Sequence, residues 1–565
     1  MIQGDWIDSP LRKKGAVMQP KNIPMKYEEL SIGVSTGKIR IPKFQREFVW
    51  SLEQTAKLID SIIKGFPIGT FIFWETSDSM RTIRSIGNEE LPPTREGQPY
   101  LYVLDGQQRI TSLFAVQKGV RFDSDGKHMD YSGICINLDV DPDADEEIVL
   151  IEIPQSATTI SVYDLLNGKV GELARRFPQE EHLDRIDTYR TRLTGYDFST
   201  ILMERYPIEI ACEVFTRINT GGTDLTLFEI MVAKTFDVDR EFDLAHEYQW
   251  LIDNDEPGDK DLSDAHFETL PPSTVLQCIA ADLAQMVRRQ DILRLDKASV
   301  IDRWSAVKEG IFSAVDYLRS SFRIPVSQLL PYNALIVPLA YFFIRNEFKP
   351  PNALQSSYLH RYFWWASLSG RFSSAVDGKL ALDIKRMEDV LCEIEPDYRG
   401  EELRLTAEDI KWRWFSASDA VCKAILCLYA FHEPISFLNN DKVRIDNSWL
   451  RRANSKNYHH FFPKSYLRKQ GLEEWQANTI INITIVDDYL NKRSISSRPP
   501  SRYLKEFKKK NPNLDSAMPS HLIGDLDSWG VWEDNYEEFI TQRSERVFQE
   551  LKARLGSLLK QEEPN

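Results

Sequence analysis

A long helical pattern in the middle of the chain constrains the fold most. Apolar residues recur at spacings of three and four from Pro272 to about Met387, with no strand-like alternation. Mixed helix and strand patterns precede this block and follow it. A chain of 565 residues is also too long for one hydrophobic core. We therefore expect an α+β, multidomain protein with domains over residues 1–240, 241–400 and 401–565, the second of them helical.

Local patterns predict individual elements on both sides of the helical block. Helices are expected where apolar residues follow helical spacing, and strands where short apolar runs are bounded by Gly, Pro or Asp. The predicted helices are 52–63, 110–116 and 536–559, and the predicted strands are 70–74, 100–104, 134–138 and 148–153. A loop or linker is predicted at 395–401. Within the block, Trp364 and Trp365 are expected to pack in the core rather than to stack on bases.

The predicted strand at 100–104 continues through Asp105-Gly106 directly into a helix. This order leaves backbone N–H groups and the positive end of the helix at Gly106, Gln107 and Gln108, which suits an anion such as phosphate. Arg109 would add a bidentate phosphate donor. Asp105 would cap the helix, hold a magnesium ion or orient a water molecule. The alternative is an ordinary capped strand-to-helix turn.

Two further segments of the first domain carry arginines in unusual contexts. Arg46 lies where polar and aromatic residues alternate, and Arg217 and Asn219 precede a Gly-Gly turn. Together with Arg109, these residues suggest a pocket for a nucleotide or for the DNA backbone. The alternative is that the arginines form structural salt bridges.

The adjacent pair His459-His460 stands out because the chain has only nine histidines. One imidazole can bind a divalent metal while the other accepts a proton from water, as phosphodiester hydrolysis requires. Residues 451–510 contain 14 Lys and Arg against 5 Asp and Glu, a net +9 in a chain whose net charge is −15. A basic region in an acidic chain indicates one anion-binding surface. A solvated charged face is the alternative.

A ββα-metal (HNH) site would use four residues of this region. His460, which leads into a Phe-Phe-Pro corner, fits the general base, and His459 fits the metal ligand. Asn482, in an apolar and β-prone run, would orient the base or its loop, and Asn491 would complete the metal site from a following helix. Asn478 competes with Asn482 for the orienting role. Each of these residues taken singly is more often structural.

Four motifs in the first domain carry a resemblance to a known family. The segments IPKFQREFVW, GFPIGTFIFWE, VLDGQQRITSL and FTRINTGGTDL occur in this order between residues 41 and 225. They resemble the N-terminal domain of GmrSD-type modification-dependent (type IV) restriction enzymes. The resemblance implies a fold similar to ParB and sulfiredoxin, with nucleotide binding and hydrolysis at the DGQQR motif. It also implies a role in anti-phage defence, since SspE-like relatives respond to DNA phosphorothioation.

The histidine region resembles the C-terminal HNH-type domain of the same family. In that domain an acidic residue-His-Ile-hydrophobic-Pro motif precedes an Asn-Leu pair and a later Asn. His459 stands where the family has the acidic residue. An imidazole shifts the preferred ion from Mg²⁺ toward softer ions such as Mn²⁺, Ni²⁺ or Zn²⁺.

These observations predict a nucleotide-regulated, metal-dependent DNA endonuclease that senses modified DNA in anti-phage defence. Its cofactors would be a divalent metal and a nucleoside triphosphate. Its partners would be modified phage or self DNA and other proteins of the defence system, and the C-terminal helix leaves a homo-oligomer open. The alternative is a nucleotide-switched DNA-binding or partner-binding protein with a degenerate nuclease domain. RNA cleavage is a third option, but the sequence has no RNA-specific signature in its support.

The sequence also predicts where the protein works. It has no apolar run long enough for a membrane helix, and its first residues lack the features of a secretion signal. Its six cysteines form no CxxC pair. We therefore expect a protein of the reducing cytoplasm, without a membrane partner.

Overall fold

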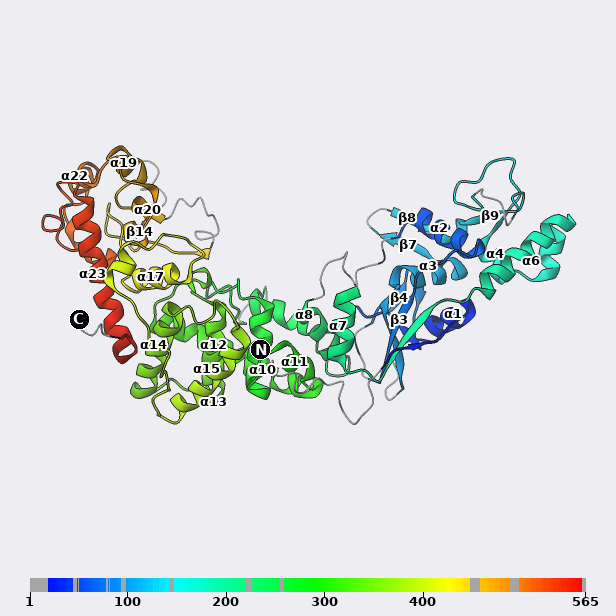
Figure 1. Ribbon diagram of the computed structural model, residues 1–565, viewed down its shortest axis with the longest axis horizontal. Coiled ribbons are helices and arrows are strands. Elements are labelled where there is room, and N and C mark those ends of the chain that lie inside the picture. Colours follow the sequence, from blue (N-terminus) through cyan, green and yellow to red (C-terminus); the bar gives the residue numbers. More distant parts are fainter. Residues whose placement is uncertain are drawn as a thin grey trace, which may run out of the picture. The chain divides into compact units, whose positions relative to one another are not determined.

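The computed structural model describes residues 19–43, 48, 50–77, 80, 82–92, 98–124, 127–141, 147–218, 226–254, 259–447, 458–486 and 497–560. The chain divides into two compact units, Met1–Leu244 (unit 1) and Ala245–Asn565 (unit 2). Both the helical block and the histidine region belong to unit 2. Figure 1 shows the elements of each unit along the chain.

Unit 1 mixes short strands with helices. Its strands are β1 (Lys21–Asn22), β2 (Ile39–Arg40), β3 (Phe71–Thr76), β4 (Ser85–Ile86), β5 (Glu89–Glu90), β6 (Tyr100–Asp105), β7 (Arg121–Ser124), β8 (Lys127–Asp130), β9 (Cys135–Asn137), β10 (Val149–Leu150), β11 (Thr159–Ser161) and β12 (Thr200–Glu204). Its helices are α1 (Tyr27–Ser35), α2 (Leu52–Ile63), α3 (Gln107–Lys118), α4 (Val162–Asn167), α5 (Val170–Arg176), α6 (Glu180–Gly195), α7 (Ile208–Ile218) and α8 (Leu227–Thr235).

The main sheet of unit 1 has five strands in the order β1-β12-β3-β6-β2. Strand β3 pairs parallel with β12 and antiparallel with β6, so the sheet is mixed. Phe71, Phe73 and Val103 from β3 and β6 are fully buried and form part of the unit's hydrophobic core. The buried strands β3 and β6 fix the place where α3 begins, directly after β6.

Helix α2 shows how the sequence sets one boundary of this unit. Ser51 and Gln54 form a capping box at its start, because each side chain accepts a hydrogen bond from the other residue's backbone N–H. Its buried residues recur at helical spacing and pack into the core beside the sheet; they include Ala56, Ile59, Ile62 and Ile63.

Unit 2 is mostly helical and contains one two-stranded sheet in its described part. Its helices are α9 (Leu244–Ile252), α10 (Pro272–Ala284), α11 (Arg289–Arg294), α12 (Lys297–Ser321), α13 (Ile336–Arg345), α14 (Ala353–Leu368), α15 (Val376–Leu391), α16 (Ala407–Lys411), α17 (Ala420–Phe431), α19 (Lys464–Lys469), α20 (Glu474–Ala477), α22 (Pro500–Lys510) and α23 (Tyr536–Leu555). Its strands are β13 (Tyr458–His460) and β14 (Ile483–Ile485).

Residues 395–401, predicted as a linker, are tied firmly to the helical part of unit 2. Arg371 and Arg386 both bind the fully buried carboxylate of Asp383, at 2.8 and 2.7 Å, and both also bind Glu401. Trp365 lies under both guanidinium groups and donates its indole N–H to the Glu401 carbonyl at 2.8 Å. The helices and the region after residue 401 therefore form one packed body.

Several predicted elements are confirmed, with shifted ends. The predicted helix 52–63 has the same bounds as α2, and the strands at 70–74 and 100–104 correspond to β3 and β6. Helix α3 begins three residues before the predicted 110–116 helix, and β10 is much shorter than the predicted strand at 148–153. Trp364 and Trp365 are each only 1% exposed, which confirms their core packing.

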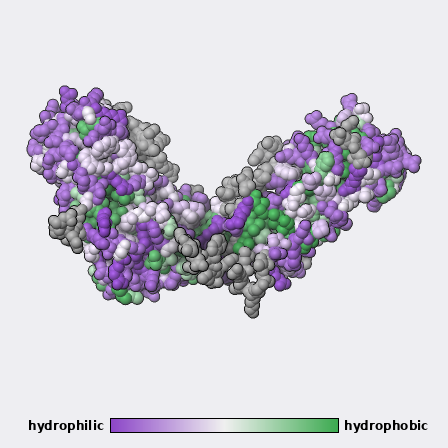
Figure 2. Space-filling model, viewed as in Figure 1, coloured by the Kyte–Doolittle hydropathy of each residue, from purple (hydrophilic) through white to green (hydrophobic). Residues whose placement is uncertain are grey.

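None of the helices that the structure describes is long and apolar enough to cross a membrane. In the view of Figure 2, hydrophilic residues cover most of the described surface, and hydrophobic residues appear in smaller patches.

Candidate functional site

The histidine pair lies on the short strand β13, which pairs antiparallel with β14. His459 stands opposite Thr484 and His460 stands opposite Ile483. Successive side chains of a strand point to opposite faces, so the two imidazoles lie in different surroundings. His459 is 3% exposed, whereas His460 is partly exposed. In Figure 1, β14 lies with α19, α20, α22 and α23 in the C-terminal part of unit 2.

The side chain of Asn478 determines the state of the His460 ring. Its Nδ2 donates to the carbonyl of Phe415 at 3.2 Å, which directs its Oδ1 to His460 Nε2 at 2.9 Å. An amide oxygen only accepts hydrogen bonds, so His460 Nε2 must carry the proton and Nδ1 keeps the lone pair. Burial lowers the pKa of His460 to about 4, although the hydrogen bond to Asn478 raises it. His460 is therefore neutral near pH 7, with Nδ1 as its basic nitrogen.

Asn482 holds the backbone that follows His460. This fully buried side chain accepts a hydrogen bond from Phe462 N–H at 2.9 Å and donates to the carbonyls of Phe462 and Ala477, at 2.9 and 3.0 Å. Its own carbonyl accepts from Phe461 N–H at 2.8 Å. The geometry thus divides the orienting role between two asparagines: Asn478 contacts the imidazole, and Asn482 fixes the loop.

Side chains of helices α22 and α23 donate hydrogen bonds to the backbone on both sides of the contact between Asn482 and Phe462. The fully buried guanidinium of Arg543 donates to the carbonyls of Ile481 and Ile483, on either side of Asn482, the second at 2.7 Å. Tyr503 donates its hydroxyl to the Phe461 carbonyl at 2.7 Å. Sequence reasoning did not single out Arg543, because its spacing within α23 gives no sign that it reaches the strand pair.

The predicted metal site is only partly within the described residues. His459 packs edge-on against the Tyr503 ring of α22, with the ring centres 6.1 Å apart. Asn491, its predicted partner, lies outside the described residues. A divalent ion needs several donors, and no group of three or more His, Cys, Asp or Glu side chains in the described part of the chain is placed to hold one. The metal therefore stays a prediction that rests on His459 and Asn491.

Charged side chains of α19 and α20 lie close to His460. Glu474 binds Lys464 Nζ at 2.9 Å and also binds Arg468. Both Lys464 and Glu474 act on the pKa of His460 through their charges. Because one carboxylate is shared by two cations, this trio keeps a net positive charge beside the imidazole.

The DGQQR motif of unit 1 forms the strand-to-helix turn that its sequence predicts. Asp105 ends β6, and Gly106 precedes α3 in the left-handed conformation, with φ of +95°. A Cβ atom on Gly106 would lie 2.3 Å from the Phe71 ring, so the tight turn requires glycine. Gln107 and Gln108 open the helix, and Gln108 is buried. Their N–H groups lie at the positive end of the helix.

Arg109 is engaged within the protein. Its guanidinium donates to the carbonyls of Ile68 and Thr70, at 2.7 and 3.1 Å, and forms an ion pair with Asp105 at 3.0 Å. A Cβ on Gly69 would lie 2.6 Å from this guanidinium, so the GFPIGT and DGQQR motifs depend on one another. In this arrangement Arg109 and Asp105 fix the turn. A phosphate contact by Arg109 stays a prediction.

Of the other predicted residues of unit 1, only Arg217 lies within the described residues. Arg217, near the end of α7, is 77% exposed and pairs with Glu213 at 2.8 Å, one helical turn earlier. Arg46 and Asn219 lie outside the described residues. The predicted common pocket for these arginines is therefore not tested by the described residues.

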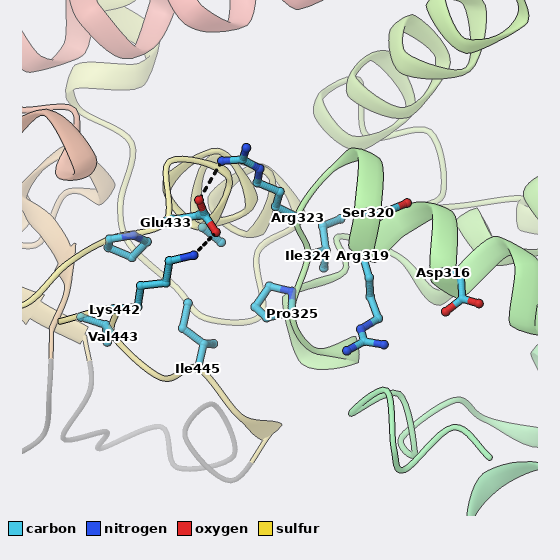
Figure 3. Close-up of a pocket in the computed structure, with 12 residues that line it drawn as sticks. Asp316, Arg319, Ser320, Arg323, Ile324, Pro325, Glu433, Lys442, Val443 and Ile445 are labelled. Carbon is cyan, nitrogen blue, oxygen red and sulfur yellow. Dashed lines mark hydrogen bonds and ion pairs between the residues drawn. The ribbon is translucent and has the colours of Figure 1, made fainter. Parts of the chain in front are cut away.

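A separate cleft of about 560 Å³ lies in unit 2 between the end of α12 and the segment after α17. Figure 3 shows Arg323 and Lys442 reaching the same carboxylate of Glu433, at 3.1 and 2.7 Å. The hydrogen bond from Lys442, together with the charge of Arg323, lowers the pKa of Glu433. None of the residues predicted from the sequence lines this cleft.

Comparison with known proteins agrees with the motifs of unit 1. The chain is 22% identical to the uncharacterized protein MJ0686 of Methanocaldococcus jannaschii over 91% of this chain and 96% of that protein. The similarity therefore extends across both units. Residues 28–236 match the family described as "GmrSD restriction endonuclease, N-terminal domain". These residues contain the β6–α3 turn and its DGQQR motif, and it is over this part of the chain that the protein is similar to the GmrSD-type restriction endonucleases.

Proposed function

We propose that this chain is a DNA endonuclease of anti-phage defence and that the β13–β14 region is its cutting site. The family of its N-terminal domain supports the endonuclease class. The observation that carries the location is His460, a neutral imidazole whose tautomer is set by Asn478 and whose loop is held by Asn482. The antiparallel pair β13–β14 and the later helix α22 would supply the strands and the helix of a ββα nuclease site, with helices α19 and α20 inserted between the two strands.

In the proposed reaction His460 is the general base. Its Nδ1 accepts a proton from a water molecule as the water oxygen attacks the phosphorus of the scissile phosphodiester. A new phosphorus–oxygen bond forms, the bond from phosphorus to one deoxyribose oxygen breaks, and that oxygen leaves to take up a proton from solvent. Lys464 and Arg468 supply positive charge for the phosphate next to the imidazole.

We further propose that His459 and Asn491 hold a divalent metal beside the scissile phosphate. Such an ion would stabilise negative charge on the phosphate. An imidazole in place of a carboxylate favours softer ions such as Mn²⁺ or Zn²⁺ over Mg²⁺.

For unit 1, we propose a nucleoside triphosphate site at the β6–α3 turn that regulates the response to modified DNA. The backbone N–H groups of Gln107 and Gln108 would contact a phosphate. Gly106 lets the turn pack closely against the Phe71 ring, and the Arg109–Asp105 pair holds the turn in shape. Arg46, Arg217 and Asn219 would complete the site from the neighbouring motifs.

A digestion experiment tests this proposal. Matched phage DNAs, unmodified, glucosylated-hydroxymethylated or phosphorothioated, are incubated with the full chain, a series of divalent metals and a panel of nucleotides. We expect metal-dependent nicking or cutting of one modified DNA, with a rate that changes with one nucleotide. Retained DNA binding without cleavage under any metal would instead favour the nucleotide-switched binding protein.

A further inference from the structure

Two tryptophans beside the candidate cutting site are unusually exposed. Trp74, Trp364 and Trp365 are each 1% exposed, as expected for large aromatic residues in a core. Trp414 and Trp475 are 48% and 52% exposed, which makes them the two exposed tryptophans among the described residues. Leaving so much indole in water is unfavourable, so packing alone does not explain these positions.

Both exposed tryptophans belong to segments that contact each other. Trp475, on α20, lies against Trp412, with ring centres 5.2 Å apart and planes inclined by 60°. Trp414 forms a backbone bridge with Thr479, just after α20. We call Trp412, Trp414 and Trp475 the tryptophan surface.

The tryptophan surface is joined to His460 through Asn478. This asparagine directly follows α20, three residues after Trp475. Its backbone carbonyl accepts from Phe415 N–H at 2.8 Å, its Nδ2 donates to the Phe415 carbonyl, and its Oδ1 contacts His460. The residue that holds the imidazole therefore also binds the segment that carries Trp412 and Trp414.

Positive charge lies near Trp475. Trp475 follows Glu474, whose carboxylate is shared by Lys464 and Arg468. The stretch 451–510, which contains Trp475, has a net charge of +9 in the sequence. Aromatic faces for bases combined with cations for the backbone are the usual composition of surfaces that bind unpaired nucleic acid.

We propose that the tryptophan surface stacks an unpaired base of the substrate next to His460. The substrate class would then be DNA with a locally unpaired strand, because the faces of paired bases are covered by their neighbours in the duplex. The proposal rests on the DNA endonuclease function proposed above. It adds that base stacking, which tolerates every base, helps to place the scissile strand.

Binding measurements on the full chain test the tryptophan surface. Three labelled DNAs of one sequence are compared by fluorescence anisotropy: a paired duplex, the same duplex with a short central bubble, and the single strand. We expect Trp475→Ala and Trp414→Ala each to weaken binding of the bubble and single strand about tenfold, with little effect on the duplex. Trp475→Phe should keep most of the affinity, because it retains an aromatic face. Leu382→Ala, which removes a 53% exposed side chain of α15, is the matched control.

The outcomes separate this inference from the proposed function. If the wild type binds and cuts DNA while both alanine variants bind the bubble as tightly as wild type, the base-stacking inference alone is wrong. Equal weakening of duplex and bubble would also overturn it, since contacts to the DNA backbone would then explain the loss. If the wild type binds none of the three DNAs, the proposed function fails together with the inference.

Discussion

At the scale of single residues, two glycines of the unit 1 motifs, Gly69 and Gly106, determine the conformation of the β6–α3 turn more than the charged residues beside them do. Gly69 and Gly106 allow the Arg109 guanidinium and the Phe71 ring to approach the turn closely. Sequence spacing predicts the turn itself, because a strand, Asp-Gly and a helix follow directly. It does not predict the partners of Arg109, since the carbonyls of Ile68 and Thr70 lie about forty residues earlier in the chain.

Gly106→Ala should destabilise unit 1 by roughly 2–4 kcal/mol. The new methyl group meets the Phe71 ring, and alanine disfavours the positive φ. Chemical denaturation of the full chain, followed by a probe in unit 1, measures the change. Gly171→Ala is the matched control: nothing lies within 4 Å of its added Cβ, and alanine suits α5. Equal stability of the two variants would contradict this account of the turn.

For the two asparagines as well, the local sequence does not predict the hydrogen-bond partners. Asn478 and Asn482 were both candidates for the orienting role, and their spacing alone did not separate them. Their hydrogen-bond partners in the structure distinguish them. Asn478 bonds to His460 and Phe415, which come from two other segments, whereas Asn482 bonds to Phe462 and Ala477.

At the scale of elements, only part of the β-prone run at 480–486, which contains Asn482, forms a strand. Residues Ile480–Asn482 form a 3-10 turn, and only Ile483–Ile485 form β14. The apolar pattern is that of a buried strand, but the hydrogen bonds of the Asn482 side chain hold the chain in a turn. Helix α2, in contrast, carries its own cap and core face, so its bounds could be predicted.

Alanine at the two asparagines should separate stability from catalysis. Asn482→Ala removes three buried hydrogen bonds and should lower the free energy of unfolding by roughly 2–4 kcal/mol. Asn478→Ala should cost less stability, yet slow DNA cleavage about tenfold or more because His460 loses its orienting partner. Denaturation curves and single-turnover cleavage rates are the measurements. Asn478→Ala cutting at the wild-type rate would show that Asn478 does not orient the base.

At the scale of the whole molecule, buried histidines should make unit 2 sensitive to acid. Burial lowers the pKa of His521 to about 4, and the positive charge of Arg543 also lowers it. The contact of His521 Nε2 with the Ile435 carbonyl acts in the opposite direction. Burial also lowers the pKa of His360 and His432. These groups bind protons more weakly in the folded state than in the unfolded state. The stability that these neutral histidines contribute to the folded state is fully present above about pH 6.5 and decreases as the pH falls toward 4.

The unfolding midpoint of unit 2 should therefore fall between pH 7 and pH 5, measured by thermal unfolding at constant ionic strength. His521→Gln, which cannot be protonated, should make this fall less steep, although the substitution itself costs some stability. A midpoint that is independent of pH would contradict the burial of these imidazoles.

The central claim is that unit 2 cuts DNA with His460 as the base. The most direct test compares cleavage by wild type, His460→Ala and the control His128→Ala, an exposed histidine of unit 1, on the DNA that the wild type cuts. The account predicts that His460→Ala loses cleavage by roughly 10²–10⁴-fold while anisotropy shows DNA binding largely intact, and that His128→Ala cuts normally. Undiminished cleavage by His460→Ala would contradict the account.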